Sequence, residues 1–311
     1  MLIIIPELPE VENVRLSLDP NVSGKTIVKA EMNYVNGLSE QAIKKIFHKQ
    51  PLDLIANRLV GSRFSDINRR GKHLIGVIHN ELNEHEMYIH VHLGMAGAWI
   101  YAENEDDIIA KYKKHIHVKL TLNDGSLLVF SDIRRHGGFS VYTAEEFIVL
   151  PSIKNLGPEP FWENTMAVVV STLRNKKWEK IGKGDLSKKS IKAALMDQSV
   201  MAGTGNIYAC EALIDSKLNP KELVKDLTDE EIIKVFSASR DLMAFSISVG
   251  GTTFRDYVNG NGEQGGFQDY LKIYGMKKCR VCSTDVISEE VAGRTTHWCP
   301  TCQQMKIRSE E

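Results

Sequence analysis

The chain has 311 residues, of which 39 are basic and 40 acidic, so that the formal net charge is −1. With 42% hydrophobic residues, 23 glycines and 9 prolines, the composition excludes fibrous and disordered classes. The sequence has no apolar run of about 18 residues or more, so no transmembrane helix is predicted. The length predicts two domains with a small additional module, and the near-neutral charge argues against a uniformly basic surface while leaving a polarised one open.

The first half of the chain predicts a β-sandwich flanked by two helices. Apolar spacing predicts the helices over 9–19 and 39–48. Strands are predicted over 26–33, 74–79, 86–92, 115–122 and 127–131. Asn123–Ser126 has the composition of a hairpin turn between the last two strands. We assign residues 1–148 to one N-terminal domain and expect an α+β protein.

The second half of the chain is predicted to be mainly helical. The proline-containing stretch 149–162 reads as a linker, and 163–275 as a helical domain. Its clearest helix spans 228–249, where a capping box at Thr228–Glu231 begins the helix and two glycines end it. The glycine-rich 251–275 is expected to be a loop. A cysteine module follows at 276–304, with a tail at 305–311.

Four of the five cysteines predict a structural zinc site. Two Cys-x-x-Cys pairs are separated by sixteen residues, the pattern in which four thiolates complete a tetrahedron: Cys279, Cys282, Cys299 and Cys302. Redox dithiols are the alternative, and His297 is a further potential ligand. Four thiolates leave no open position, so one Zn²⁺ would stabilise the module rather than catalyse. The odd cysteine count and the absence of a secretory leader favour a cytoplasmic protein.

Charge and glycine patterns suggest a nucleic-acid partner without establishing one. Basic residues gather in 174–192, whereas 103–107 is acidic. In Asp197–Tyr208, a helix is expected to end near Gln198 and a new one to begin at Asn206, where free N–H groups suit a phosphate. Taken alone, this motif fits an ordinary corner between two helices equally well.

Five motifs in order carry a more specific resemblance. They are Pro6–Val11, His92–Gly97, Asp132–His136, Ile191–Tyr208 and the four-cysteine module. Together they resemble the formamidopyrimidine-DNA glycosylase and endonuclease VIII family, and the bacterial formamidopyrimidine branch in particular. The resemblance implies a β-sandwich, a helix–two-turns–helix DNA-binding domain with a lesion loop, and a zinc finger, with damaged double-stranded DNA in a cleft and the target nucleotide rotated out of the helix. It also implies a monomer that does not associate with a membrane and needs no nucleotide cofactor.

The resemblance also implies catalytic roles for residues near the start of the chain. A secondary amine at Pro6 would attack the sugar C1′, releasing the base, and β,δ-elimination would cut the strand. Glu7 matches the acid that protonates the sugar ring oxygen, and Glu10 matches a second acid, although both also suit the first turn of a helix. Lys72 matches the proton donor in β-elimination and Arg294 the residue of δ-elimination. Alternatively, Lys72 and Arg294 are ordinary solvent-exposed surface side chains.

DNA contacts are implied at further positions. Met95, Arg134 and His136 match the residues that fill the space left by the flipped nucleotide, where the family usually has an aromatic residue in place of His136. Phosphate contacts are expected from Lys72, His92, His115, Asn206, Arg294 and Lys192. His115 and His117 alternate along a strand and are expected to face the same way. Gly260–Phe267 resembles the loop that closes over an oxidised purine, which favours 8-oxoguanine and formamidopyrimidines over oxidised pyrimidines.

The sequence departs from the family at its first residues. Family enzymes begin Met-Pro-Glu, whereas five residues precede Pro6 here, so that its nitrogen is an amide without nucleophilic character. Translation from the codon of Ile5 would restore an N-terminal Pro6 after removal of methionine. One alternative is a damage-binding protein with impaired catalysis, or one that uses another amine such as Lys72. The others are an endonuclease VIII-like enzyme for oxidised pyrimidines and a zinc-ribbon transcription factor, which leaves Pro6–Val11 unexplained.

Overall fold

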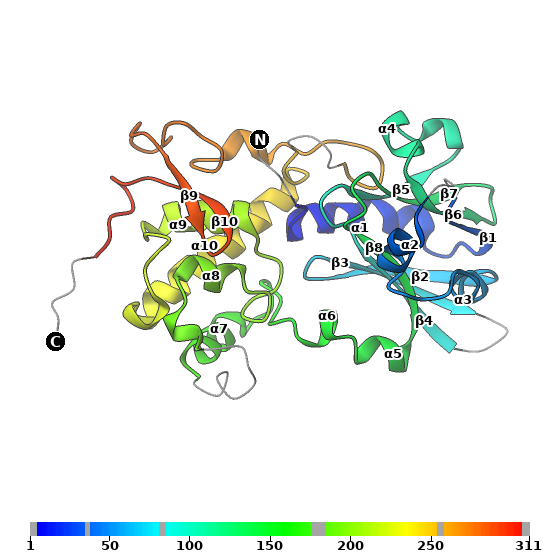
Figure 1. Cartoon of the computed structure of the whole chain (residues 1–311), viewed down its shortest axis with the longest axis horizontal. Coiled ribbons are helices and arrows are strands. Elements are labelled where there is room, and N and C mark those ends of the chain that lie inside the picture. Colours follow the sequence, from blue (N-terminus) through cyan, green and yellow to red (C-terminus); the bar gives the residue numbers. More distant parts are fainter. Residues whose placement is uncertain (1–4, 35–37, 81–84, 176–184, 254–257, 307–311) are drawn as a thin grey trace. The chain divides into compact units, whose positions relative to one another are not determined.

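A computed structural model describes residues 5–34, 38–80, 85–175, 185–253 and 258–306 (Figure 1). The chain divides into two compact units. The N-terminal unit is built from Ile3–Lys154 and Ile247–Gln268, and the C-terminal unit from Asn155–Ser246 and Asp269–Glu311. The first division lies inside the predicted linker 149–162. The segment Ile247–Gln268, which the sequence groups with the helical domain, belongs to the N-terminal unit by its contacts.

Two antiparallel four-stranded sheets form the N-terminal unit. One has the order β1-β6-β7-β5, with strands Ile27–Met32, Ile116–Leu122, Leu127–Asp132 and Gly97–Ala102. The other has the order β2-β3-β4-β8, with strands Ser62–Arg70, His73–Asn80, His85–His92 and Gly138–Thr143. All six residues of β7 are buried, because Leu128 and Phe130 face the main core while Leu127 and Val129 face a second cluster. These sheets confirm the predicted sandwich.

Helices cover and connect the sheets of this unit. Helix α1, Leu8–Val22, packs Val14 and Leu18 into the main core. The predicted second helix is α2, Glu40–Ile46, which Ser39 caps by accepting a hydrogen bond from the amide of Ala42. The other α-helices described in this unit are α3 (Leu52–Leu59), α4 (Ala110–Lys113), α5 (Ala144–Ile148) and α6 (Pro151–Lys154).

Strand β2 shows why several elements escape prediction from periodicity. It carries many polar residues, and a register shift between Phe64 and Asp66 breaks the alternation of its buried positions. Phe64 and Ile67 are nevertheless buried in the core. Strand β8 alternates less clearly because it contains Gly138 and Ser140. Pairing with neighbouring strands, rather than the local sequence pattern, therefore determines that these segments form strands.

The C-terminal unit consists of helices followed by a two-stranded hairpin. The helices are α7 (Thr165–Arg174), α8 (Ile191–Met196), α9 (Asn206–Ser216) and α10 (Asp229–Ser248), and the hairpin pairs β9 (Ile287–Val291) with β10 (Arg294–Trp298). Thr228 and Glu231 form the predicted capping box of α10. Within the described ranges, none of the helices is long and apolar enough to cross a membrane.

Candidate functional site

Pro6 lies directly before the first turn of α1, between the half-buried Ile5 and the buried Glu7. Glu7 is the N-cap, and its side chain and that of Glu10 form a reciprocal capping box with the backbone. The amide of Glu7 donates to Glu10 Oε2 at 2.8 Å. Glu7 is 2% exposed and Glu10 fully buried, so neither is an ordinary solvated first-turn glutamate.

Glu10 also binds the segment that follows α10. Its Oε1 accepts a hydrogen bond from the amide of Thr252 at 2.8 Å. Gly250 and Gly251 have φ angles of +86°, which favour glycine, and a Cβ on Gly251 would lie only 3.3 Å from Glu10 Oε1. The same acid therefore shapes the first turn of α1 and anchors the chain after Gly251.

Lys72 sits, half-buried, in the tight turn between β2 and β3. Gly71 in this turn has a φ of +56°, and its carbonyl accepts a hydrogen bond from the guanidinium of Arg69. Arg69 Nε also binds Glu12 Oε2 of α1 at 2.7 Å. This ion pair joins the turn that carries Lys72 to the helix that follows Pro6.

Two interlocked loops carry Met95, Arg134 and His136. A Cβ on Gly94 would lie 2.4 Å from the Gly137 nitrogen, and one on Gly137 would lie 2.5 Å from the carbonyl oxygen of His92, so these backbones touch. Met95 and Arg134 are half-buried and His136 is exposed. Planar and apolar side chains on adjoining rigid loops can enter a base stack together.

Buried Asp132 holds the second loop at both ends. Its Oδ1 accepts from the Arg134 amide at 3.0 Å and its Oδ2 from the Gly137 amide at 2.7 Å. This role of the Asp132 side chain is not among those predicted from the sequence. An aspartate two residues before a turn residue is a signal for such an Asx turn and could have identified it.

His92 belongs to a row of histidines on β3 and β4. Nε2 of His90 lies 2.9 Å from Nδ1 of His73, and the rings of His73 and His92 are 5.1 Å apart. Burial lowers the pKa of His92 to about 4 and that of His90 to about 3, with the nearby positive groups adding to the effect. His92 is therefore a neutral hydrogen-bonding group at neutral pH.

The predicted alternation of His115 and His117 is wrong. His115 is half-buried and precedes β6, whereas His117 is 2% exposed and its Nε2 lies 3.0 Å from the carbonyl oxygen of Asp132. A register shift between Ile116 and Val118 inserts one extra residue and interrupts the alternation.

Lys192 and Asn206 form a buried network in the C-terminal unit. Lys192 is fully buried, and its Nζ lies 2.6 Å from both Asn206 Oδ1 and Thr296 Oγ1. Asn206 Nδ2 donates to the carbonyl of Thr295 at 2.8 Å. Both side chains thus connect α8 and the start of α9 to β10. The position of Lys192 in a lysine-rich stretch of the sequence does not indicate this buried role.

The described part of the basic stretch 174–192 is not an open basic surface. Arg174 pairs with Asp229, Lys188 with Asp185, and Lys189 with Asp197. Lys176, Lys177, Lys180 and Lys183 lie outside the described residues. The acidic segment also has partners, since Lys119 binds Glu105 and Lys113 binds Asp106.

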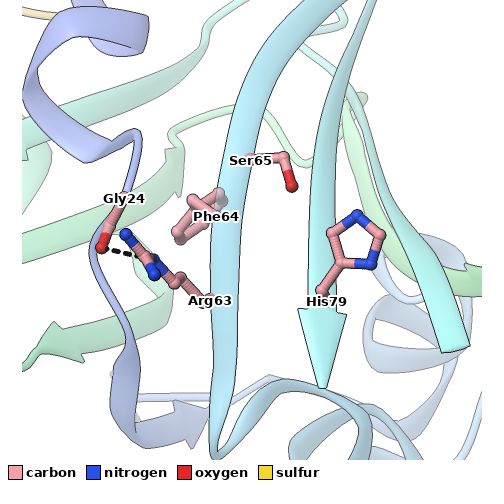
Figure 2. A pocket seen from close by; sticks show the side chains of 5 residues that line it. All are labelled: Gly24, Arg63, Phe64, Ser65 and His79. Atoms are coloured by element: carbon pink, nitrogen blue, oxygen red, sulfur yellow. Dashed lines mark hydrogen bonds between the residues drawn. The ribbon is translucent and has the colours of Figure 1, made fainter. Parts of the chain in front are cut away.

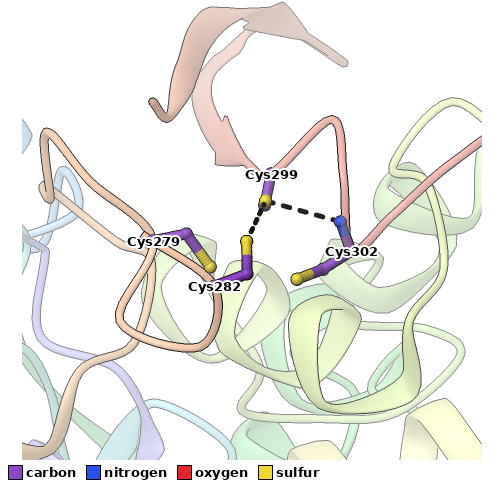
Figure 3. Close-up of side chains that lie close together, drawn as sticks. All are labelled: Cys279, Cys282, Cys299 and Cys302. Carbon is purple, nitrogen blue, oxygen red and sulfur yellow. Dashed lines mark hydrogen bonds between the residues drawn. The ribbon is translucent and has the colours of Figure 1, made fainter. Parts of the chain in front are cut away.

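The four predicted zinc ligands come together at one point (Figure 3). Their Sγ atoms all lie within 4.8 Å of one another, and those of Cys282 and Cys299 are 3.4 Å apart. Tetrahedral Zn–S bonds of about 2.3 Å place sulfurs about 3.8 Å apart, so the cluster fits one Zn²⁺. His297 is buried and packs edge-on against Tyr274, 5.0 Å between ring centroids.

Arg294 lies at the tip of the finger hairpin. The turn residues Ala292 and Gly293 both have positive φ angles, 56° and 71°, as in a two-residue turn that follows the twist of the strands. Arg294 begins β10 and is exposed. The hairpin thus presents an accessible guanidinium immediately beside its turn.

Each unit contains part of the predicted site. Pro6, Glu7, Glu10, Lys72, His92, Met95, His115, Arg134 and His136 belong to the N-terminal unit. Lys192, Asn206, Arg294 and the four cysteines belong to the C-terminal unit. The loop Gly260–Phe267 lies in the N-terminal unit, where the Gly260 amide donates to Ser17 Oγ of α1 at 2.7 Å.

Family comparisons match most of the chain. The formamidopyrimidine-DNA glycosylase N-terminal domain matches residues 5–139, the H2TH domain of the same enzymes 156–258, and the zinc finger found in FPG and IleRS 277–304. A formamidopyrimidine-DNA glycosylase of Heliobacterium modesticaldum is 36% identical over 96% of this chain and its own full length. One of Listeria monocytogenes is 33% identical over the same shares.

Solved structures agree with these matches. A Lactococcus lactis Fpg variant in complex with a Fapy-dG containing DNA is 29% identical, with a TM-score of 0.79 over 96% of this chain and 100% of that chain. The L. lactis Fpg with an abasic site containing DNA is 28% identical, with the same TM-score and coverage. The three family models and the relatives of 33% and 36% identity cover most of the chain: the protein belongs to the formamidopyrimidine-DNA glycosylase family.

Proposed function

We propose that the protein is a bifunctional DNA glycosylase and AP lyase that removes oxidised purines, 8-oxoguanine and formamidopyrimidines, from duplex DNA in base excision repair. The observation that carries the proposal is the arrangement at the start of α1. Pro6 is buried and is followed by two buried acids, Glu7 and Glu10, that only a functional or capping role can account for. The family match begins at residue 5, immediately before this proline.

The chemistry needs an unprotonated secondary amine. The Pro6 nitrogen attacks C1′ of the flipped nucleotide, the N-glycosidic bond breaks, and the base leaves with a proton. Glu7 protonates the sugar ring oxygen, so that the ring opens and an iminium forms between Pro6 and C1′. Burial disfavours a charged ammonium and thus supports a nucleophilic Pro6 once its nitrogen is free.

Strand cleavage follows from the iminium. Loss of a C2′ proton expels the 3′ phosphate in β-elimination, and a second elimination expels the 5′ phosphate; water then releases Pro6. Lys72 serves as the proton donor of the first elimination and Arg294 contacts phosphate in the second. The ion pair of Arg69 with Glu12 supports this assignment, because it restrains the turn that holds Lys72.

This mechanism requires Pro6 to be the N-terminal residue of the active protein. We attribute this to translation from the codon written as Ile5, read as methionine, and removal of that methionine. Residues 1–4 lie before the family match, which supports the assignment. Intact-mass measurement on protein from its native source tests it: a mass that begins at Pro6 is expected, and a retained Met1–Ile5 would contradict it.

The remaining site residues would hold the DNA. Met95, Arg134 and His136 fill the space left by the flipped nucleotide, with Arg134 facing the orphaned base. His92, His115, Asn206, Lys72 and Arg294 contact phosphates, and Lys192 acts through its bond to Asn206. Neutral His92 would serve as a donor rather than a cation. Lesion recognition is assigned to Gly260–Phe267.

Zn²⁺ would be held by the four clustered thiolates. A module of about thirty residues has too little core to fold alone, so the metal would supply its stability. The tetrahedron has no open position for a substrate.

A second candidate function is binding of damaged DNA without strand cleavage. If five residues remain ahead of Pro6, its amide nitrogen cannot form an iminium, and the protein would bind damaged DNA without cutting it. Duplexes with a single 8-oxoguanine, a formamidopyrimidine or thymine glycol separate these functions. Base release from the first two and strand cleavage support the enzyme; tight binding without release supports the binder; preference for thymine glycol would contradict the purine assignment.

A further inference from the structure

The N-terminal unit has two further pockets. One contains none of the site residues assigned above, and the other contains one of them, Arg134. One, of about 390 Å³, is lined by Gly24, Arg63, Phe64, Ser65 and His79 (Figure 2). Its single guanidinium is already bound, since Arg63 Nε donates to the carbonyl of Gly24 at 2.9 Å. Arg63 is the only lysine or arginine that lines this pocket, and part of its hydrogen-bonding capacity is already used.

The other pocket, of about 620 Å³, gathers five cationic side chains. Three come from the end of α2 and the turn after it, and two from the loop that Asp132 holds: Lys44, Lys45, Lys49, Arg134 and Arg135. Lys44 pairs with Glu40. In the part of the chain that the structure describes, the other four have no acidic partner within 4.0 Å. Like charges repel one another, so the unpartnered cluster favours an anionic ligand.

Backbone geometry directs these side chains to one place. The amide of Lys49 donates to the carbonyl of Lys44 at 2.7 Å, which closes the turn after α2. Lys49 and Arg135 have φ angles of 64° and 58°, the left-handed region that non-glycine residues rarely adopt. Strained backbone at two cationic positions of one pocket is typical of a binding surface.

We propose that this pocket binds the phosphodiester backbone of the DNA strand opposite the lesion. The proposal rests on the proposed function, because Arg134 lies both in the pocket and in the loop assigned to the orphaned base. A strand whose base faces Arg134 brings its neighbouring phosphates to the same loop. Lys45 and Lys49 are exposed and present mobile ammonium groups, which suit phosphate contacts that do not depend on sequence.

The pocket thus extends the DNA contact surface from the Asp132–Gly137 loop to α2. It would add affinity without taking part in the chemistry. A free phosphate or nucleotide has the same anionic group, and the experiment below separates that source from DNA.

The test compares Lys45→Gln/Lys49→Gln with wild type on a duplex that contains an abasic-site analogue, in protein processed to Pro6. Each lost phosphate contact lowers the slope of log Kd against log salt by about 0.9, so a decrease of about 2 is expected, with about tenfold weaker binding at low salt. Lys29→Gln/Lys154→Gln removes the same charge elsewhere and is expected to change the slope little. Thermal unfolding verifies that both variants fold.

Neutral methylphosphonates placed singly in the undamaged strand locate the contact. Wild type is expected to lose affinity at one or two positions near the orphaned base, and the double variant to be insensitive there. Equal slopes and equal sensitivity in both proteins would overturn the pocket assignment alone. Competition by inorganic phosphate that Lys45→Gln/Lys49→Gln abolishes, with an unchanged DNA slope, would also overturn it. Failure of wild type to bind the duplex would overturn the proposed function as well.

Discussion

Glu10 and Thr252 are joined across 242 residues of the sequence: Glu10 Oε1 accepts a hydrogen bond from the Thr252 amide at 2.8 Å. The other oxygen of the same carboxylate accepts from the Glu7 amide, also at 2.8 Å. The fully buried acid therefore fixes the first turn of α1 and the chain after α10 at once. A residue that the family pattern presents as an auxiliary acid is also a structural clamp of the N-terminal unit.

Replacement of Glu10 by glutamine tests the clamp. Glutamine offers one acceptor oxygen and no charge, so one of the two bonds is lost and the other weakened. The free energy of unfolding is expected to fall by about 1–3 kcal/mol. Urea titration measures it, with Glu145→Gln on an exposed position of α5 as control, expected within about 0.5 kcal/mol of wild type. Equal stabilities of the two variants would refute the clamp.

Lys192 is predicted to be a structural lysine. Lys192→Met preserves the length of the side chain but leaves Asn206 Oδ1 and Thr296 Oγ1 without this donor. A cost of about 1–3 kcal/mol in the free energy of unfolding is expected from buried groups left unsatisfied. Lys188→Met, on a side chain that is 71% exposed, serves as the control. A larger loss of stability in the control would contradict the buried network.

The buried histidines predict acid sensitivity of the N-terminal unit. The pKa of His90 is lowered to about 3 and that of His92 to about 4, with burial as the main cause. In the unfolded chain both titrate near about 6.5, so unfolding takes up protons between these values. The contribution of each neutral histidine to the free energy of unfolding is therefore complete above pH about 6.5 and is lost progressively as the pH falls toward about 4. Each histidine lowers the free energy of unfolding by up to about 1.4 kcal/mol for every pH unit in this range.

Urea midpoints between pH 4.5 and 7.5 measure this dependence. His90→Gln keeps a hydrogen-bonding side chain but cannot titrate, and is expected to flatten the curve in this range. Replacing the exposed His136 by glutamine should leave its slope unchanged. A pH dependence that His90→Gln does not alter would show that other groups cause it.

Zinc removal is expected to unfold the finger hairpin. Cys302→Ala breaks the tetrahedron of thiolates and should lower the bound zinc from one ion per chain to none at micromolar chelator. Cys210→Ala is the matched control, because Cys210 is a buried cysteine on α9 outside the cluster. Metal analysis after dialysis measures both. Full zinc content in Cys302→Ala would refute the four-thiolate site.

The features that can be predicted from the sequence are those that depend on short motifs. The zinc cluster follows from two Cys-x-x-Cys pairs, and the α10 capping box follows from Thr228 and Glu231. Each pair and the capping box join residues only three positions apart. Strand β2 is not predictable in this way, since a bulge interrupts its pattern and pairing with β3 stabilises it.

Long-range contacts account for the rest. The burial of Lys192 depends on Thr296, 104 residues later, and the position of Ile247–Gln268 in the N-terminal unit depends on Glu10 and Ser17. Charge counting predicts a basic surface at 174–192, yet Arg174, Lys188 and Lys189 are neutralised by partners that the sequence does not identify. Local composition does not reveal which charges are paired.

Borohydride trapping determines whether Pro6 is the nucleophile, because it reduces the iminium to a stable amine at the residue that formed it. Protein that begins at Pro6 is incubated with an 8-oxoguanine duplex and borohydride, and the cross-linked peptide is identified by mass spectrometry. We expect a covalent adduct on the Pro6 nitrogen, formed by the Pro6-terminal protein and absent from the chain that retains Met1–Ile5. An adduct on Lys72, or none with the Pro6-terminal protein, would contradict it.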